Sequence, residues 1–494
     1  MDAYLDQLSA IAPEITLTAF ALLVLVVDLL KKGRDSDVVG YITLGGLAIV
    51  AYQLATSWGD ATPSEPVFGM VLTDRFANFF KLFTTLSLAA VVIFVLNDKN
   101  ERKHGIGEYY FLLLGAAIGI FFMVSTNNLL LLMLGLELLS LASYSLAGFH
   151  KGERKSAEAS MKYVIFGGLS AGIMLYGISL LYGMTGTIDL AEMGTSGNLA
   201  TQMASTPVPV AVAVVMVLAG FAYKVSVVPF HFWTPDVYEG APTPVTTFLA
   251  VASKAAGFGA LLRFVGAFFM REGVNVDVAA YGDRIGLLVG IMAAVTMTIG
   301  NLAALRQTSI KRLLAYSSIA HAGYTMIGVA VMTETGFSAA MYYLAAYYFM
   351  NLGAFGFLLY FEGVTGSDTI DSLKGLGWKA PMAAIPMVAF LVSLTGLPPT
   401  VGFYGKYLLF VEGIDAGFAW LVVVAALNSV VSLFYYFRIA KSLFLAEPSE
   451  KPAAFQPLLL GFLALLAFGT VMLGLYTAPL EVWAKRSLDM LAGI

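Results

Sequence analysis

The chain has 494 residues, of which 59% are hydrophobic and 12% are charged, and its formal net charge is −4. A soluble domain carries roughly 25% charged residues, so this composition indicates an all-α polytopic membrane protein with short polar loops. The weak negative charge gives no support to nucleic-acid binding, and the absence of cysteine excludes disulfides, thiol catalysis and iron–sulfur ligation by thiolates.

About fourteen segments are predicted to span a membrane as helices, because a span needs about 20 predominantly apolar residues. The acidic N-terminus lacks the basic region of a signal peptide, so the first helix is expected to be retained. Breaks are expected inside the seventh and twelfth spans. In chain order, the spans are expected over 8–30, 38–58, 77–97, 108–125, 127–148, 159–183, 207–234, 243–270, 284–305, 312–332, 337–361, 381–411, 416–445 and 454–477.

Lysine and arginine are concentrated in the loops that follow odd-numbered spans. Loops after even-numbered spans hold little more than Arg75, Arg271 and Arg284. Basic residues favour the cytoplasmic side of a membrane, so the odd loops are predicted to be cytoplasmic and both termini to lie outside.

No loop is long enough for a folded domain, and the sequence contains neither a P-loop nor a dinucleotide-binding glycine motif. The four histidines do not form a metal-ligand pattern. We therefore expect no cofactor and no metal.

The seventh span contains an ionisable residue beside a helix break. Its second half, from Leu218 to Trp233, places Lys224, Pro229 and His231 within eight positions. Pro229 has no N–H, and its ring collides with the carbonyl four residues back, so the helix is expected to break there. An ionisable group near the bilayer centre is expensive and usually marks an ion or proton path. Lys224 is therefore predicted to handle protons, whereas His231 is equally compatible with a structural hydrogen bond.

Two further charged residues are expected at similar depth. Glu137 lies about ten residues into the fifth span, roughly 15 Å along the helix and close to mid-membrane. Lys254 lies about ten residues into the eighth span, too far from either end to reach the interface easily. A buried carboxylate stays ionised only beside a cation, so Glu137 is predicted to respond to one. The alternative is an ion pair that only fixes helix packing.

The twelfth span repeats the combination of a broken helix and a lysine. Pro398, Pro399 and three glycines interrupt an apolar run that leads directly to Lys406. A simple kink would not require a buried charge, so Lys406 is predicted to be functional. His321, in the tenth span, is equally compatible with a structural and a functional role.

Three other basic residues, Lys81, Lys162 and Arg263, lie nearer the ends of their spans. Long basic side chains near a helix end can extend to the interface. We expect them to be interfacial anchors, although a buried role for Lys162 is almost as well supported.

Spacing within the chain indicates an internal repeat, as in transporters with paired broken helices. Spans 4–8 (residues 108–271) would correspond to spans 9–13 (residues 283–445), and because five is odd the second copy would be inverted. Helices 1–3 (residues 1–107) would precede the repeats, and helix 14 (residues 446–494) would follow them. The matched positions are Glu137 with His321, Lys224 with Thr400, Lys254 with Ser429 and Arg263 with Arg438.

Two long stretches carry a family resemblance. The first runs from Gly220 to Pro244 and begins Gly-Phe-Ala-Tyr-Lys-Val-Ser-Val-Val-Pro-Phe-His-Phe-Trp; the second runs from Ile310 to Tyr324. Both resemble the antiporter-like membrane subunits of the proton-pumping NADH:quinone oxidoreductase, respiratory complex I, and the match covers essentially the whole chain. Lysine at positions 254 and 406, without a C-terminal extension carrying a lateral helix, resembles the subunit N branch.

The resemblance implies a multi-pass subunit of a bacterial inner-membrane complex, with two inverted five-helix repeats and discontinuous helices 7 and 12. Glu137 and Lys224 would be a coupled ion pair, Lys254 the central relay and Lys406 the lysine of the second half-channel. His231 and His321 are expected to contribute to the same row of polar groups near the membrane midplane. The partners would be neighbouring antiporter-like subunits, small membrane subunits and lipid. The subunit would have no redox centre, and quinone reduction elsewhere in the complex would drive it.

Two alternatives remain open. An Mrp-type cation/proton antiporter subunit shares the fold and much of the motif, and sodium-dependent transport without NADH would favour it. A scaffold subunit, whose buried charges only secure packing, would lose assembly but not pumping per assembled complex when its lysines are replaced.

Overall fold

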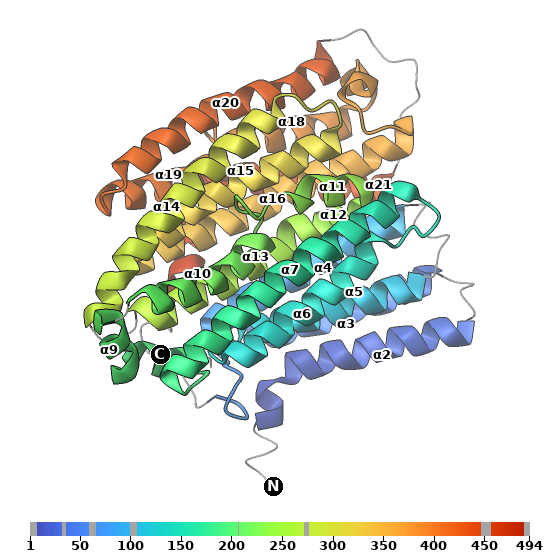
Figure 1. Ribbon diagram of the computed structural model, residues 1–494. Helices are drawn as coiled ribbons and strands as arrows, with labels where there is room; N and C mark the ends of the chain where they lie inside the picture. Colours follow the sequence, from blue (N-terminus) through green and yellow to red (C-terminus); the bar gives the residue numbers. More distant parts are fainter. Residues whose placement is uncertain are drawn as a thin grey trace.

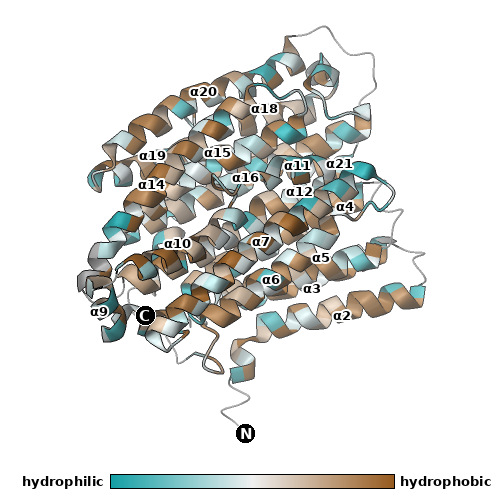
Figure 2. Ribbon diagram, viewed as in Figure 1, coloured by the Kyte–Doolittle hydropathy of each residue, from teal (hydrophilic) through white to brown (hydrophobic). Residues whose placement is uncertain are grey.

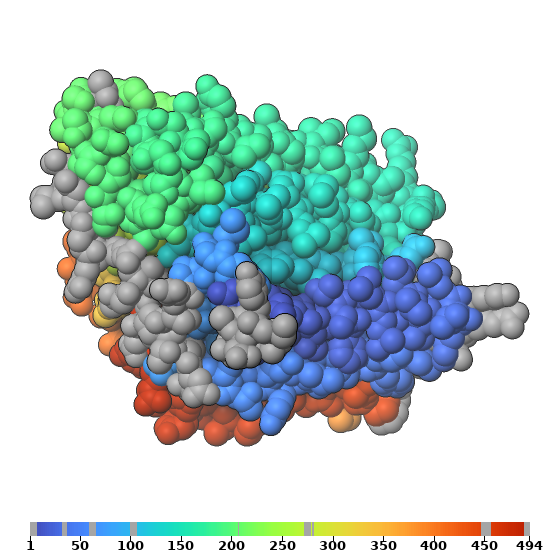
Figure 3. Space-filling view, turned by 90° about the horizontal axis from the view of Figure 1, so that it is seen from below, coloured from blue at the N-terminus to red at the C-terminus, as the bar shows by residue number. Residues whose placement is uncertain are grey.

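The computed structural model describes residues 7–31, 36–58, 66–98, 106–205, 207–270, 276–445 and 456–488, which form helices and no strand longer than an isolated bridge. The long helices run side by side in one bundle, with α2 (Ala12–Lys31) along one edge and α20 (Ala419–Phe444) along the other (Figure 1). Apolar residues cover the lengths of the helices, and polar residues gather toward their ends (Figure 2). On the face seen in Figure 3, α2 (Ala12–Lys31) lies at the surface between the α7 region and the C-terminal segment.

Twelve helices in the described ranges are long and apolar enough to cross a membrane. The two remaining expected spans are the tenth, whose first turn carries Lys311 and Arg312, and the twelfth, which is split in two. The all-α polytopic fold is thus confirmed. The helices of the first half are α2 (Ala12–Lys31), α3 (Ser36–Thr56), α4 (Arg75–Asn97), α5 (Ile106–Val124), α6 (Leu129–Ala147), α7 (Arg154–Thr185), α8 (Leu190–Thr195), α9 (Gly197–Ser205), α10 (Pro207–Lys224), α11 (Trp233–Gly240), α12 (Thr243–Phe248), η2 (Leu249–Ser253), α13 (Lys254–Val265) and η3 (Gly266–Met270). Those of the second half are α14 (Val276–Ala304), α15 (Ile310–Ala330), α16 (Glu334–Thr365), η4 (Ile370–Leu373), α17 (Leu376–Lys379), α18 (Pro381–Thr395), α19 (Val401–Asp415), α20 (Ala419–Phe444), α21 (Pro457–Leu475) and α22 (Ala478–Arg486).

Both expected helix breaks are present, and they are built in the same way. α10 ends at Lys224, the next-but-one residue Ser226 is left-handed with φ +65°, and the Val227 N–H donates to the carbonyl of Ala222. α18 ends at Thr395, followed by a left-handed glycine with φ +86° and the equivalent bond from the residue after it. This hydrogen-bond pattern closes a helix C-terminus by satisfying its last carbonyls. The breaks are therefore defined turns, and in the first case the helix ends before Pro229, as expected.

In both halves, the residue that caps one helix pairs with the segment that follows the next helix, as α6 does with the segment after α7 and α15 with the segment after α16. The caps of α6 and α15, Asn128 and Ser309, each form an isolated bridge, with Asp189 and Thr369 respectively. In both halves the long helix, α7 or α16, has 32 residues and ends at a left-handed glycine. These shared features support a repeat, while its proposed boundaries remain a prediction.

The shared features also correct the register of the repeat. The caps match Asn128 with Ser309, and because Glu137 lies nine residues after Asn128, it corresponds to Ser318 and not to His321. The turns likewise match Ser226 with Gly396, which places Lys224 on Leu394 and not on Thr400. The alignment by residue spacing was wrong because it matched similar residue types. The register of the two halves is set instead by helix caps and turns of fixed geometry.

The match of Arg263 with Arg438 agrees with the contacts of both side chains. The Arg263 Nε donates to the carbonyl of Val124, the last residue of α5, at 2.9 Å. The Arg438 Nη1 donates to the carbonyl of Leu305, just beyond α14, at 3.0 Å. Each arginine thus satisfies a free carbonyl at the end of the first helix of its half.

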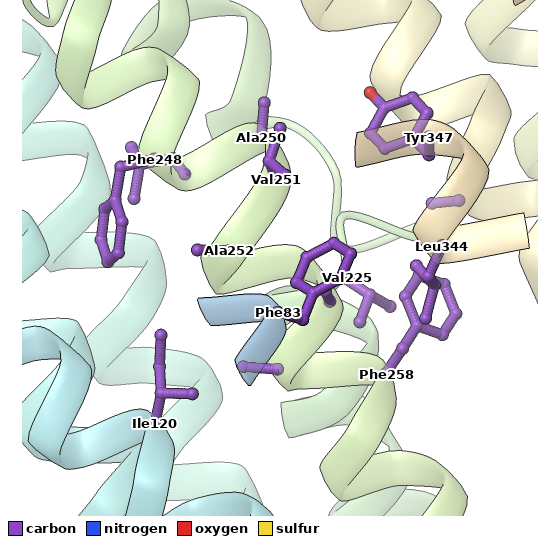
Figure 4. Packing of buried hydrophobic residues seen from close by; sticks show 14 of the residues in the cluster. Phe83, Ile120, Val225, Phe248, Ala250, Val251, Ala252, Phe258, Leu344 and Tyr347 are labelled. Atoms are coloured by element: carbon purple, nitrogen blue, oxygen red, sulfur yellow. The ribbon is translucent and has the colours of Figure 1, made fainter. Parts of the chain in front are cut away.

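The segment from α12 to η3 lies in the interior of the bundle and is fully buried. It packs against α4, α5 and α10 on the N-terminal side and against α16 on the other. In Figure 4, Phe258 of α13 lies near Val225 of the helix break and Leu344 of α16. Charged residues on this segment therefore sit between the two halves, remote from lipid.

Candidate functional site

The first predicted pair brings Lys224 close to α6. Lys224 is the last residue of α10, 2% exposed, and its Nζ donates to the Ser140 Oγ at 3.3 Å. Ser140 is three positions after Glu137, on the same face of α6. Within the described residues, Glu137 and Lys224 form no direct ion pair, and the buried Glu137 Oε1 has no hydrogen-bond partner. Each is nevertheless the charged group that acts on the other, so this is a separated pair in which only Lys224 contacts the intervening Ser140.

Lys254 occupies the junction of two helix types. The π-helical turn Leu249–Ser253 ends directly before it, and such turns are frequent at functional sites. The Lys254 Nζ donates to the Ser318 carbonyl at 2.9 Å and also to the Ser318 Oγ. No carboxylate pairs with it in the described part of the chain. Its ammonium is thus held by neutral oxygens of α15, which belongs to the other half.

His321 lies three positions further along α15, within a buried network of hydroxyl groups. Its Nδ1 is 2.6 Å from the Tyr343 hydroxyl, and its Nε2 is 3.0 Å from the Tyr436 hydroxyl. The Tyr436 hydroxyl in turn bonds the Ser317 Oγ, beside the serine that holds Lys254. The positive charges that act on His321 are those of Lys406 and Lys254. His321 therefore lies between the two lysines.

Lys406 is placed against the end of the broken helix α18. Its Nζ donates to the carbonyls of Leu394 and Thr395 at 3.2 and 2.9 Å and to the Ser429 Oγ at 3.2 Å. A helix C-terminus leaves its last carbonyls free and carries partial negative charge, so it suits an ammonium group. The helix break thus supplies the carbonyls that bind the Lys406 ammonium, and the two features belong together, as the sequence predicted. A side chain at Gly396 would come within 2.7 Å of the Lys406 Cδ, so this turn needs glycine for room as well as for its left-handed backbone.

Tyr324 continues the line from His321 to Lys406. Its ring lies 5.8 Å from the His321 ring, and the Lys406 Nζ stands over it at 4.4 Å from the centroid. The Ser429 Oγ donates to the Tyr324 hydroxyl at 3.2 Å, so serine, tyrosine and lysine are in mutual contact. Polar groups thus extend from Lys254 through α15 to Lys406.

His231 does not join this line. It lies in the turn between α10 and α11, is buried, and has its ring 4.5 Å from that of Phe232, tilted by 33°. Its Nδ1 has no hydrogen-bond partner in the described residues.

Arg263 and Lys81 are not interfacial anchors, and that expectation was wrong. Arg263 is fully buried and forms a two-bond pair with Asp74, both bonds at 2.8 Å. Lys81 is equally buried and pairs with Glu14 at 2.6 Å. Both acids lie near helix starts and are distant in sequence from the basic residues that they pair with. The residue pattern within one span therefore could not reveal the pairs. Both pairs place opposite charges in contact, although neither buried oxygen of Glu14 has a hydrogen-bond partner among the described residues.

A charged cluster lies at the end of α11, beyond the seventh span. Asp236 accepts from Lys162 at 2.6 Å and from Arg312 at 2.8 Å, and Glu239 accepts from Lys155 and Arg312. Burial acts to raise the pKa of Asp236, but the hydrogen bonds from Lys162 and Arg312 outweigh it and hold the pKa below its usual value. Lys162 is therefore part of a partly exposed ion network, which joins the acids of α11 to basic residues near the starts of α7 and α15.

One further carboxylate, which the sequence analysis missed, lies near the start of the segment that carries Lys254. The Glu362 Oε2 accepts from the Thr243 Oγ1 at 2.6 Å, and Thr243 begins α12. Its only signal in the sequence is an acid at the end of the eleventh span. Within the described residues, no group of three histidine or acidic side chains could hold a metal ion.

Known proteins similar to this chain share its sequence and its fold. A family model described as NADH:quinone oxidoreductase/Mrp antiporter, TM, matches residues 126–432. NADH-quinone oxidoreductase subunit N 2 of Sorangium cellulosum (strain So ce56) is 44% identical over 504 residues, covering 98% of each chain. A chain of respiratory complex I from Thermus thermophilus has 33% identity and a TM-score of 0.78, covering 95% of this chain and 98% of that chain. A chain of the Mrp complex from Dietzia sp. DQ12-45-1b has 21% identity and a TM-score of 0.84 over 98% of both chains, a likeness of fold alone.

Proposed function

Because this chain belongs to the NADH:quinone oxidoreductase/Mrp antiporter family of membrane subunits, we propose that it carries protons across the membrane as a subunit of NADH:quinone oxidoreductase, of the subunit N type. The observation that carries the proposal is the placement of Lys224, Lys254 and Lys406. All three are buried, and none is paired directly with a carboxylate among the described residues. A structural ammonium group is normally neutralised, as Lys81 is by Glu14. Lysines held by neutral oxygens are suited to gaining and losing a proton.

Glu137 is proposed as the switch for Lys224. An ionised carboxylate nearby favours the ammonium form, and burial without it favours the neutral amine. At an effective dielectric of about 20, moving a charge from about 8 to about 4 Å changes the interaction by roughly 2 kcal/mol. That is about thirtyfold in the protonation equilibrium. A change of about 4 Å in the distance between the two charges is therefore enough to load or unload the lysine.

The proton then passes from Lys224 to Lys254 and on toward Lys406. Direct contacts between the first two lysines are absent from the described residues, so ordered water is required there. From Lys254 onward, Ser318, Tyr436 and His321 supply hydroxyl and imidazole groups that can each accept and donate. We propose that His321 takes part in this transfer. Among the described residues, His231 makes no hydrogen bond to the path, and it is better explained by packing.

The remaining features of the subunit follow from this assignment. It would have no redox centre, and quinone reduction elsewhere in the complex would supply the energy. Its partners would be neighbouring antiporter-like and small membrane subunits of a bacterial inner-membrane complex. The charged loops of Lys155, Asp236 and Arg312 would face the cytoplasm, and both termini the outside.

The proposal is tested by Glu137→Ala and Lys224→Ala in the assembled complex, reconstituted into vesicles. NADH-driven proton transport should be lost in both, while the amount of assembled complex stays near that of the wild type. Glu334→Ala, an exposed acid at the start of α16, is the matched control and should pump normally. Wild-type coupling in the Glu137→Ala vesicles would refute the proposed switch.

An Mrp-type cation/proton antiporter subunit is the second candidate. The fold is compatible with both, but the relative with 44% identity is an NADH-quinone oxidoreductase subunit, and this favours the first. Sodium-dependent transport without NADH, by the chain and its co-purified partners, would favour the second.

A further inference from the structure

A basic pocket lies at one end of the bundle, outside the lysine line. It has a volume of about 360 Å³ and is formed by the segment before α15, by η4 and the loop after it, and by the end of α20. Its polar lining consists of the cations Lys374, Arg438 and Lys441, the acid Asp371, and the hydroxyls of Thr308 and Ser442. Three cations against one acid give the lining a net charge of +2.

The contacts of these side chains leave positive charge available. Asp371 pairs with Lys374 at 3.0 Å, at the exposed rim. The two terminal nitrogens of Arg438 donate to the carbonyls of Leu305 and Gln307, and its buried Nε has no partner in the described residues. Lys441 is exposed and has no carboxylate partner in that part of the chain. The pocket therefore presents cationic donors that no described acid neutralises.

An apolar stripe on α20 leads directly to this pocket. Its side chains are spaced by three or four residues, so they share one face of the helix, and all are strongly exposed. The same spacing continues to Lys441 and to the exposed Leu445. Such a face, apolar along the span and cationic at its end, is the profile of a surface that meets lipid. The stripe consists of Val423, Leu427, Val430, Phe434 and Phe437.

An exposed tryptophan marks the depth of the pocket. Trp378 of α17 donates through its Nε1 to the Phe444 carbonyl at 2.9 Å, at the end of the same helix α20. Tryptophan is enriched at the membrane–water interface, because its apolar ring can lie against lipid while its N–H remains in a polar environment. Beside it, Met382 and Ile385 of α18 are also exposed. The pocket thus lies at the level where phospholipid headgroups begin.

From these features we propose that the pocket binds the phosphate of an anionic phospholipid, whose acyl chain lies along the α20 stripe. Lysine and arginine are the usual donors to phosphate oxygens, and basic pockets between membrane helices bind anionic headgroups. Cations in the last turns of α20 also complement the helix dipole. That effect explains neither the concave pocket nor the contribution of Lys374 from another segment. The binding does not depend on the proton path, since none of these residues contacts it.

The test is lipid retention by the full complex in nanodiscs of defined composition. The complex is placed in discs of phosphatidylcholine with increasing phosphatidylglycerol, and bound phosphatidylglycerol is counted by mass spectrometry after detergent washing. Each lysine near a headgroup is worth roughly a fivefold change in binding, so Lys374→Gln with Lys441→Gln should weaken retention by about 25-fold. Lys441→Gln alone should weaken it about fivefold. Lys379→Gln is the matched control, because Lys379 is exposed on α17 and does not line the pocket.

Three results would overturn the proposal. The first is equal retention of phosphatidylglycerol by the double variant and the control. The second is displacement of the lipid by millimolar inorganic phosphate in the wild type, which would indicate a site for a free anion. The third is loss of a neighbouring subunit, without loss of lipid, in the double variant, which would indicate a protein interface.

Discussion

Replacing Lys406 with arginine separates the charge of this residue from its ability to release a proton. The Lys406 ammonium stabilises the free carbonyls of Leu394 and Thr395 and stands over the Tyr324 ring. Arginine also donates to carbonyls and stacks on aromatic rings, but it stays protonated at any physiological pH. In Lys406→Arg the helix end remains neutralised, while proton transfer through this position stops.

The size of the effect follows from the ordinary pKa values of the two side chains. Arginine holds its proton about 2 pKa units or more above lysine, which corresponds to about 3 kcal/mol and a rate of release lowered at least a hundredfold. Lys406→Met gives the complementary change, because it removes the charge and leaves two carbonyls and a serine without their donor. Each lost bond to a charged group costs roughly 1.5–3 kcal/mol, so the methionine variant should also assemble less well.

The assay measures NADH-driven acidification of vesicles, normalised to the amount of assembled complex. Lys406→Arg should assemble normally and pump at less than about one-tenth of the wild-type rate, in line with the hundredfold loss in proton release. Lys151→Arg, an exposed lysine in the loop after α6, is the matched control and should pump normally. Normal pumping by Lys406→Arg would mean that this residue carries charge but no proton, and the reasoning would fail.

Two other predictions concern the ion pairs. Asp74→Asn should cost about 3–5 kcal/mol and reduce assembly strongly, because it leaves the buried Arg263 charge unpaired. The double variant Asp74→Leu with Arg263→Met should restore assembly. Equal assembly of the wild type and both variants would contradict a structural pair. Asp236→Asn should lower the thermal stability of the complex by about 1 kcal/mol at pH 7. Since the pKa of Asp236 is below its usual value, the contribution of this carboxylate is complete above about pH 4 and is lost as the pH falls through the lower pKa. The difference between wild type and variant in thermal melting should therefore shrink as the pH falls below about 4, and a difference that stays constant down to the acid limit of stability would exclude this ion network as its source.

The sequence predicted those parts of the fold and site in which a residue stands out from its neighbours. A charged side chain within an apolar run is conspicuous, so Glu137, Lys224, Lys254 and Lys406 could be found one at a time. The breaks in the seventh and twelfth spans were equally visible from Pro229 and its counterparts. Each of these signals lies within a single segment of chain.

Features that depend on two distant segments were missed. Asp74 and Arg263 are 189 residues apart, so the sequence around neither residue indicates that they form an ion pair. Ser318, which holds Lys254, is a small hydroxyl of a type common in membrane helices, and only its position across the helix interface gives it significance. The register of the repeat failed for a related reason, because it is set by turns and caps whose residue types differ between the halves, such as Ser226 and Gly396.

The central claim is that protons cross this subunit through lysines held by neutral oxygens, and Lys254 is the position that tests it most directly. It links the two halves, and its ammonium contacts only Ser318 in the described structure. The decisive measurement is the number of protons translocated per NADH oxidised by vesicles containing Lys254→Met, with Lys379→Met as control. We expect loss of proton translocation by the assembled Lys254→Met complex and a normal ratio in the control. A wild-type ratio in the Lys254→Met vesicles would contradict it.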